Sequence, residues 1–462
     1  MDFQVVIIGA GLAGSECAYQ LAKRGIAVGL IEMRPHKMTP AHTTGDPAEL
    51  VCSNSFRSND IHNAVGLIKD EMRCLDALTM RAANLARVPA GSALAVDRAV
   101  FSRAVGEGLA SLEKIRRVNG EVIGITRDGD VTVVRLSDGQ CLSCQAVVIA
   151  TGPLTAEPLS KWIASHMGGQ HLYFYDAIAP IVAADSINMS LAFKASRYGK
   201  GDDAAGDYLN CPFTGEQYEI FINSVRGAEL TEVHDFDKAQ FFEGCLPIEV
   251  MAARGLDVLR YGPMKPVGLT DPRHPEARPH AVVQLRQDNL HASLYNMVGF
   301  QTRMKWGEQK RVFRLIPGLE NAEFVRLGAM HRNTYLCSPR VLDAGMELKS
   351  FAHVHFAGQM TGCEGYVESA AVGLSVGLFL AERLQKRRDL LPPPPTTALG
   401  ALLRHILKAD PDRFQPMNIN FGLFEDLPSH VRKSDKKQKL VARAQNDFHQ
   451  WICNNSIDLT NQ

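Results

Sequence analysis

The sequence predicts an α/β protein whose central parallel sheet takes its strands from distant parts of the chain. Three strand-like segments carry this prediction, and each leads into a glycine-containing turn: residues 5–8, 147–149 and 353–356. The first two are uninterrupted apolar runs, which are typical of strands buried on both faces. Because the three segments are so far apart, we expect a two-part Rossmann-like domain with other structure inserted between its parts.

The first segment opens a βαβ unit that has the pattern of a dinucleotide site. A helical pattern over 15–24 ends at Gly25, and a second strand over 27–31 ends at Glu32. The glycine motif alone is a weak signal, but here it lies between a strand and a helix, with an acidic residue where the second strand ends. We expect Gly9 to form the turn, the helix start to bind phosphate and Glu32 to bind a ribose hydroxyl. The expected nucleotide contacts in this unit are Gly9, Ala10, Gly11, Leu12, Ala13, Gly14 and Glu32.

The later segments indicate which nucleotide is bound. Segments 121–126 and 131–136 have the pattern of an antiparallel ribbon, and the strand after them reaches Gly152. Strand 353–356 leads into a loop with Gly358, Gln359 and Gly362, and a helical run over 367–384 follows. In two-part flavoproteins such a late loop closes over the flavin, whereas a single NAD domain needs none. We therefore favour FAD as the cofactor, although an ordinary strand–helix loop is the simpler alternative.

Composition changes along the chain suggest four parts. Residues 1–183 and 317–391 are expected to form the two parts of the FAD-binding domain. Residues 184–316 are irregular and aromatic-rich, and they are expected to form an inserted α+β domain. Residues 392–462 begin with four prolines, a stiff linker, and continue as a helical C-terminal segment.

Charge and hydropathy exclude several classes of protein. The chain has 462 residues, with 50 Lys and Arg against 50 Asp and Glu. Apolar residues make up 45% of the chain and charged residues 22%, which excludes a disordered chain, and the zero net charge excludes binding of nucleic acid by overall charge alone. No run approaches the ~20 apolar residues of a spanning helix, so we expect no membrane association and a cytoplasmic protein. A nucleic acid would need a local basic patch, and two segments offer one. The first has Arg303, Lys305, Lys310, Arg311 and Arg314 with Trp306 and Phe313, and the second has Arg432, Lys433, Lys436, Lys437, Lys439 and Arg443.

Two of the ten cysteines have surroundings that suggest chemistry. Cys52 lies in a polar segment that leaves the nucleotide unit, and Cys211 precedes an expected helix start near Thr214, which would lower its pKa. Core packing is the alternative for both. Cys141 and Cys144 form a C-x-x-C pair with no partner pair, so a zinc or redox role is not favoured. Cys245 and Cys363 stay open, and we expect no metal site.

Long strings in the sequence resemble the folate- and flavin-dependent tRNA (uracil-5-)-methyltransferases. They begin with Gly-Ala-Gly-Leu-Ala-Gly-Ser-Glu at 9–16 and Glu-Leu-Val-Cys-Ser-Asn at 49–54. Others are Asn-Cys-Pro at 210–212, Phe-Glu-Gly-Cys-Leu-Pro at 242–247 and Phe-Ala-Gly-Gln-Met-Thr-Gly-Cys-Glu-Gly-Tyr at 356–366. The similarity runs nearly end to end, so the chain is identified as a member of this family.

The resemblance implies a reductive methylation. FAD, reduced by NADPH or NADH, would take the methylene carbon of 5,10-methylenetetrahydrofolate and pass it to C5 of a T-loop uridine in tRNA, giving 5-methyluridine. Uracil C5 becomes nucleophilic only after a thiolate adds at C6. By similarity, Cys211 is expected to be that nucleophile, and Cys52 to act on the flavin–methylene adduct or in protonation.

Three alternatives stay open at this point. Some relatives methylate a uridine of large-subunit ribosomal RNA with the same motifs. A related flavoprotein modifies the wobble uridine with a GTPase partner, but those chains are distinctly longer. A non-catalytic flavin- or RNA-binding paralogue is the third, and the presence of both cysteines disfavours it. The sequence does not predict the oligomeric state, the choice of nicotinamide or the folate contacts.

Overall fold

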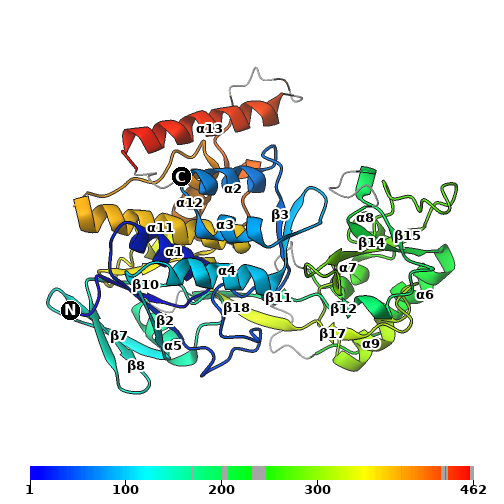
Figure 1. The fold of residues 1–462 in the computed structure, drawn as a ribbon, viewed down its shortest axis with the longest axis horizontal. Coiled ribbons are helices and arrows are strands. Elements are labelled where there is room, and N and C mark those ends of the chain that lie inside the picture. The colour runs from blue at the N-terminus through cyan, green and yellow to red at the C-terminus, as the bar shows by residue number, and fades with distance from the viewer. Residues whose placement is uncertain are drawn as a thin grey trace.

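The computed structural model describes residues 1–167, 171–199, 206–231, 246–386, 388–427, 432 and 435–457. For residues 171–177 and 330–333 only the backbone is described. One end of the molecule is built on a parallel sheet with helices around it, and the other end on a second, antiparallel sheet (Figure 1).

The parallel sheet has five strands in the order β19-β10-β1-β2-β6. Their bounds are β1 Val5–Ile8, β2 Val28–Glu32, β6 Ile115–Asn119, β10 Ala146–Ile149 and β19 Val354–Phe356. Every neighbouring pair is parallel, and all residues of β1 and β10 are buried. The predicted α/β class with a parallel sheet is therefore confirmed, and β10 brings the late strand β19 to the edge beside the first βαβ unit.

Helices α1 (Leu12–Lys23) and α11 (Tyr366–Lys386) lie against each other beside this sheet. Their backbones touch because α11 has glycine at the crossing. A Cβ at Gly373 would lie 2.2 Å from the carbonyl oxygen of Ala13. Further helices of this part are α2 Ala64–Cys74, α3 Leu78–Leu85, α4 Arg98–Ala110, α5 Glu157–His166 and α10 Ser338–Val341.

Two small antiparallel sheets complete this part. Strands β3 (Ser55–Ser58), β5 (Ala93–Val96) and β4 (Arg87–Val88) form one. Strands β7 (Val122–Asp128), β8 (Val131–Leu136) and β9 (Cys141–Cys144) form the other. The pairing of β7 with β8 confirms the predicted antiparallel ribbon.

The second large sheet has six strands in the order β13-β14-β15-β16-β12-β17. Its strands are β12 Ile181–Ala183, β13 Phe193–Lys194, β14 Tyr208–Phe213, β15 Ala281–Gln287, β16 Leu294–Met297 and β17 Phe324–Arg326. Side chains from one face form an apolar core with α6 (Gly215–Arg226), α7 (Ile248–Arg254), α8 (Val258–Tyr261) and α9 (Trp306–Phe313). β12 and β17 lie outside the expected range 184–316, so the sheet extends past both of its ends.

A two-stranded ribbon connects the two large sheets. β11 (His171–Ala177) and β18 (Met330–Leu336) run antiparallel, and the chain enters and leaves the second sheet through them (Figure 1). Both crossings therefore lie side by side.

The C-terminal helices α12 (Ala398–Lys408) and α13 (Lys436–Asn454) pack over α2. The start of α12 is fixed by a residue from far earlier in the chain. The buried carboxylate of Glu71 accepts hydrogen bonds from the backbone N–H groups of Ala398 and Leu399, both at 2.7 Å. Of the helices in the described residues, none has the length and hydropathy to cross a membrane.

Replacing Glu71 should destabilise the protein through this helix start. Glu71→Ala leaves two buried N–H groups without an acceptor, which costs about 2–3 kcal/mol of unfolding free energy. Urea unfolding followed by circular dichroism measures the change. Glu107→Ala on the exposed face of α4 is the control, and an equal effect of both substitutions would contradict the role of Glu71.

Candidate functional site

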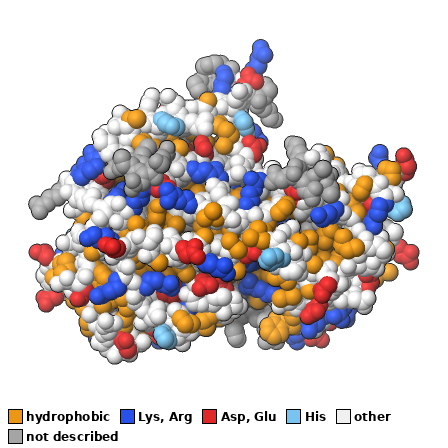
Figure 2. Space-filling model, in the orientation of Figure 1, with side chains coloured by type: hydrophobic (Ala, Val, Ile, Leu, Met, Phe, Trp, Pro, Cys, Tyr) orange, Lys and Arg blue, Asp and Glu red, His pale blue; other side chains and the backbone are white. Residues whose placement is uncertain are grey.

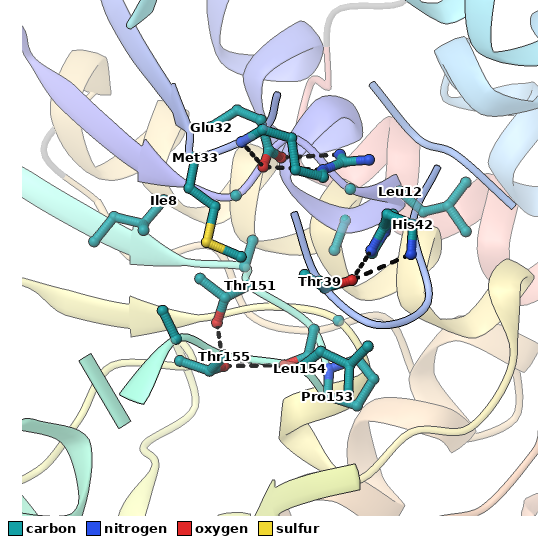
Figure 3. Close-up of a pocket in the computed structure, with 18 of the residues that line it drawn as sticks. Ile8, Leu12, Glu32, Met33, Thr39, His42, Thr151, Pro153, Leu154 and Thr155 are labelled. Atoms are coloured by element: carbon teal, nitrogen blue, oxygen red, sulfur yellow. Dashed lines mark hydrogen bonds and ion pairs between the residues drawn. The ribbon is translucent and has the colours of Figure 1, made fainter. Parts of the chain in front are cut away.

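A cavity lies at the carboxyl ends of β1, β2 and β10, where ligands bind in open α/β sheets. It contains about 1090 Å³ of space, counting the part open to solvent. Figure 3 shows Glu32 and Met33 on one side of it and Thr151, Pro153 and Thr155 on the other. The described residues that line it come from five segments: 8–13, 31–51, 120–122, 150–159 and 357–369.

The glycine motif forms the floor of the cavity. Gly9 has a φ of +100°, and a Cβ there would lie 2.7 Å from the carbonyl oxygen of Ala150. A Cβ at Gly14 would lie 1.9 Å from the carbonyl oxygen of Gly9, so only glycine lets α1 approach the turn. Gly11 is the N-cap of α1 and has no capping side chain. The first N–H groups of α1 are therefore left for a ligand, as a phosphate requires.

Glu32 lines the cavity as a carboxylate held in place by Arg34. Its oxygens accept hydrogen bonds from Ala10 N at 3.0 Å and from Arg34 N, Nε and Nη2 at 3.0–3.1 Å. Burial alone would raise the pKa of Glu32, but the hydrogen bonds and charge of Arg34 outweigh it and hold that pKa below its ordinary value. Arg34 also pairs with Glu49 at 3.2 Å. Arg34 was not among the predicted site residues, although it stands only two positions after Glu32.

His42 also lines the cavity, where the charges of Arg34, Glu49 and Glu32 act on it. Its Nδ1 lies 2.6 Å from Thr39 Oγ1 (Figure 3). Burial and the nearby charge of Arg34 lower the pKa of His42 to about 4, while Glu49 acts in the opposite direction. The imidazole is therefore neutral at neutral pH and offers hydrogen bonds to a ligand without adding charge.

The late loop borders the same cavity. Gly358 has a φ of +81°, and a Cβ there would lie 2.7 Å from the Cβ of Ala13, so the loop lies directly on the start of α1. Gln359 lines the cavity and donates to Glu364 at 2.7 Å. Of the expected cofactor contacts, the structure brings Gly9, Gly11, Leu12, Ala13, Glu32, Gly152, Gly358 and Gln359 to the cavity wall. Ala10, Gly14 and Gly362 lie behind it, and Gly362 packs against the ring of Phe414.

Cys52 is half-buried at the edge of the cavity, next to the lining residue Val51. The hydroxyl of Tyr366, another lining residue, accepts hydrogen bonds from Cys52 N at 2.7 Å and Ser53 N at 3.1 Å. Arg98 donates to the carbonyl oxygen of Cys52 at 3.3 Å and pairs with Asp288 at 3.1 Å. The backbone around the thiol is thus fixed by groups from α4, β15's end and α11. Sequence patterns did not single these groups out, because their positions are distant in the chain.

Cys211 lies elsewhere, inside the apolar core of the six-stranded sheet. It is 0% exposed and lies on β14, opposite Val283 of the neighbouring strand β15, and its Sγ faces Gly318. The expected helix does begin at Gly215 with Thr214 as N-cap, but the expected lowering of the thiol's pKa is wrong. Burial raises the pKa of Cys211 to about 12, and Glu320 acts in the same direction. The structure does not bring Cys211 to the cavity.

The other cysteines named in the sequence analysis are Cys141, Cys144, Cys245 and Cys363. Cys363 is buried in the loop before α11, and burial raises its pKa. Cys141 is exposed and Cys144 buried on β9. Cys245 lies outside the described residues. Among the residues that the structure describes, no group of His, Cys, Asp and Glu side chains is arranged to hold a metal ion.

The basic segment around α9 is less free for RNA than its sequence suggested. Lys305 pairs with Glu229 at 2.9 Å and Arg311 with Glu308 at 2.6 Å. Of the two aromatic residues in this segment, Phe313 is 0% exposed and has no face for a base, whereas Trp306 is 68% exposed. In the C-terminal segment, Lys437 and Lys439 are exposed on α13, and Lys433 lies outside the described residues.

Comparison with known proteins identifies the family. A family model described as glucose inhibited division protein A matches residues 4–388. A methylenetetrahydrofolate–tRNA-(uracil-5-)-methyltransferase TrmFO of Geobacter sp. is 51% identical, covering 98% of this chain and 99% of the relative. The chain belongs to the TrmFO family.

Other TrmFO relatives and a solved structure agree with this assignment. The TrmFO of Acetivibrio thermocellus is 53% identical, covering 93% of this chain and 94% of its own. The crystal structure of Aquifex aeolicus GidA has a TM-score of 0.71 at 16% identity, covering 97% of this chain and 73% of that one. At this identity the GidA structure shows a shared fold.

Because His42 is neutral in the folded protein, the pH dependence of the unfolding free energy in acid tests the position of His42 in the cavity wall. Because its folded pKa of about 4 lies below the ordinary 6.5, the folded state resists protonation. Stability should be fully present above pH 6.5 and decrease as pH falls toward 4, by about 3 kcal/mol from this group. Chemical unfolding at several pH values measures the decrease. His42→Gln should remove that part of it, and an unchanged pH profile in the variant would contradict the assignment.

Proposed function

We propose that the protein transfers the methylene carbon of 5,10-methylenetetrahydrofolate to C5 of a T-loop uridine in tRNA and reduces it to 5-methyluridine. The observation that carries this proposal is the position of Cys52 at the edge of a dinucleotide cavity, in a chain about half identical to TrmFO proteins over its full length. This reaction needs a thiol beside a flavin, and the cavity provides a place for both.

The residues of the cavity fit FAD. The uncapped start of α1 and the close turn at Gly9 suit a pyrophosphate, and the ionised Glu32 suits a ribose hydroxyl. The late loop with Gly358 and Gln359 adds the second side that a flavin requires. Bound FAD would supply the redox chemistry that converts the methylene carbon into a methyl group. The same residues leave the reductant open between NADPH and NADH.

Cys52 is the thiol that we assign to the reaction. Tyr366 and Arg98 hold its backbone, so the segment that carries the thiol is fixed beside the cavity. The nucleophile role expected for Cys211 is not supported, because its Sγ is enclosed by apolar side chains that disfavour a thiolate. We assign tRNA rather than ribosomal RNA as substrate, since the TrmFO names specify tRNA, and place the reaction in the cytoplasm.

We also propose a division of the chain that follows the sheets. Residues 1–177 and 330–391 would form the FAD-binding domain in two parts, and residues 178–329 the inserted α+β domain. This division keeps β12 and β17 with the strands they pair with. The helical segment 392–462 would extend the FAD-binding part, because α12 and α13 pack on α2.

Reconstitution tests the function directly. The purified protein with FAD, labelled methylenetetrahydrofolate and either NADPH or NADH should place label in the T-loop of an unmodified tRNA transcript, as 5-methyluridine. A ribosomal RNA fragment is the matched control. Label in the ribosomal fragment alone would replace the substrate, and label in neither, with FAD bound, would contradict the reaction.

Single cysteine substitutions test the thiol assignment. Cys52→Ala should abolish methyl transfer, a loss of at least about 1000-fold, and retain FAD. Cys211→Ala should keep FAD and lie within about threefold of the parent, since it removes only a buried thiol. Cys245→Ala belongs in the same series because its segment shares the family string. Full activity of Cys52→Ala, or loss of activity with normal folding in Cys211→Ala, would reverse the assignment.

A further inference from the structure

A polar face of the six-stranded sheet lies beside Cys52. Register places Arg286 of β15 opposite Asn296 of β16, Asn296 opposite Ile181 of β12, and Ile181 opposite Arg326 of β17. Their neighbours along the strands, such as Leu285, Tyr295 and Val182, belong to the apolar core on the other face. Because strand side chains alternate between faces, Arg286, Asn296 and Arg326 share the side that meets the segment around Cys52.

This face carries more positive than negative charge, because the one carboxylate of Asp288 faces Arg98, Arg286 and Arg326 together. Arg98 pairs with Asp288, and Arg34 takes both Glu32 and Glu49. In contrast, Arg286 is only 7% exposed, and its guanidinium donates to two neutral groups, Asn54 Oδ1 at 2.8 Å and Ser53 Oγ at 2.7 Å.

Arg326 has still less compensation. Its one hydrogen bond among the described residues goes to the carbonyl oxygen of Ala41 at 3.4 Å. The charged and titratable groups near it are Arg98, Tyr366, Cys52, Glu49, Asp288 and the neutral His42. Glu49 is already paired with Arg34, and Asp288 with Arg98. Burial and the charge of Arg98 lower the pKa of Arg326. The amide nitrogen of Asn296, which is 3% exposed, makes no hydrogen bond to any described group.

A buried and a half-buried guanidinium group that both lack a direct ion pair are unusual. An unpaired buried charge costs several kcal/mol, so proteins pair such groups or use them to bind a ligand. Nothing among the described residues pairs with Arg286 or Arg326. The position of both groups beside Cys52 explains their retention if a negatively charged ligand completes the site.

We propose that Arg326, with Arg286 behind it, binds an anionic oxygen of the substrate that reaches Cys52. The inference rests on the proposed role of Cys52 as the reacting thiol. Arg326 is the contact group because it is half-buried, whereas Arg286 is 7% exposed, and because it lies on the edge strand β17. Arg286 is enclosed and acts through its charge. Phosphate and carboxylate share the required chemistry, so either an RNA phosphate or a carboxylate of the folate can be the source.

Differential alkylation of Cys52 measures this charge without any turnover. In the FAD-loaded protein the thiolate displaces iodide from iodoacetate, which is anionic, or from iodoacetamide, which is neutral. The ratio of the iodoacetate rate to the iodoacetamide rate should be about tenfold higher at Cys52 than at the exposed Cys453 at low salt. The ratio at Cys52 should decrease as salt is added. Peptide mass spectrometry reads both cysteines in one sample.

Substitution of Arg326 should lower this ratio. Arg326→Gln should reduce it at Cys52 by at least about threefold, and Arg326→Lys should keep most of it because the charge remains. Arg278→Gln, an exposed arginine in the loop before β15, is the matched control and should change nothing. A ratio at Cys52 that equals the ratio at Cys453, or that Arg326→Gln leaves unaltered, would overturn the proposal.

Binding measurements then identify the source of the anion. A T-arm RNA hairpin and tetrahydrofolate serve as separate probes, with affinity measured for the parent, Arg326→Gln and Arg278→Gln. Arg326→Gln should weaken the binding of one probe about tenfold, and that probe identifies the source of the anion. Arg278→Gln should change the affinity for each probe by less than about twofold. Weakening of neither probe by Arg326→Gln overturns the proposal.

The activity of Cys52→Ala tests the proposed function, and the alkylation and binding measurements test the anion site separately. If Cys52→Ala retains methyl transfer, the assignment of Cys52 as the reacting thiol fails. The alkylation ratio and the probe affinities of Arg326→Gln still decide whether the anion site exists.

Discussion

The ion pair between Arg98 and Asp288 joins the two large parts of the molecule at the place where chemistry is expected. Arg98 begins α4 on the nucleotide side, and Asp288 follows β15 of the second sheet. Both are largely buried, so loss of either partner would leave a charge in a poorly solvated position. The same guanidinium donates to Leu50 and Cys52, so the segment with the thiol depends on the fit between the two sheets.

Local patterns predicted the nucleotide half of the molecule well. The buried runs that form β1 and β10 are short, β-branched and followed by glycine-containing turns, so adjacent residues suffice to recognise them. Partnerships across hundreds of residues were not predictable. The bonds from Tyr366 to the backbone of Cys52 and the caps from Glu71 to α12 depend on the tertiary fold, which short-range spacing does not contain.

Cys211 shows how a correct local prediction gave a wrong chemical one. The helix after it and its cap at Thr214 are present. However, the helix dipole acts on a group only when that group lies near the helix start and is solvated enough to ionise. Cys211 points into the core because its strand alternates between faces, and the sequence did not show which face was apolar. Desolvation therefore determines its pKa.

The order of the strands has a consequence for synthesis on the ribosome. Four strands of the parallel sheet are complete by residue 149, but the edge strand β19 begins only at Val354. Until some 200 further residues emerge, β10 presents an unpaired edge, which is a template for wrong pairing with other chains. The second sheet is formed by one contiguous segment and is complete at Arg326, whereas the nucleotide sheet stays incomplete until β19 has been made. The nascent chain is thus most exposed to aggregation while its inserted part is being made.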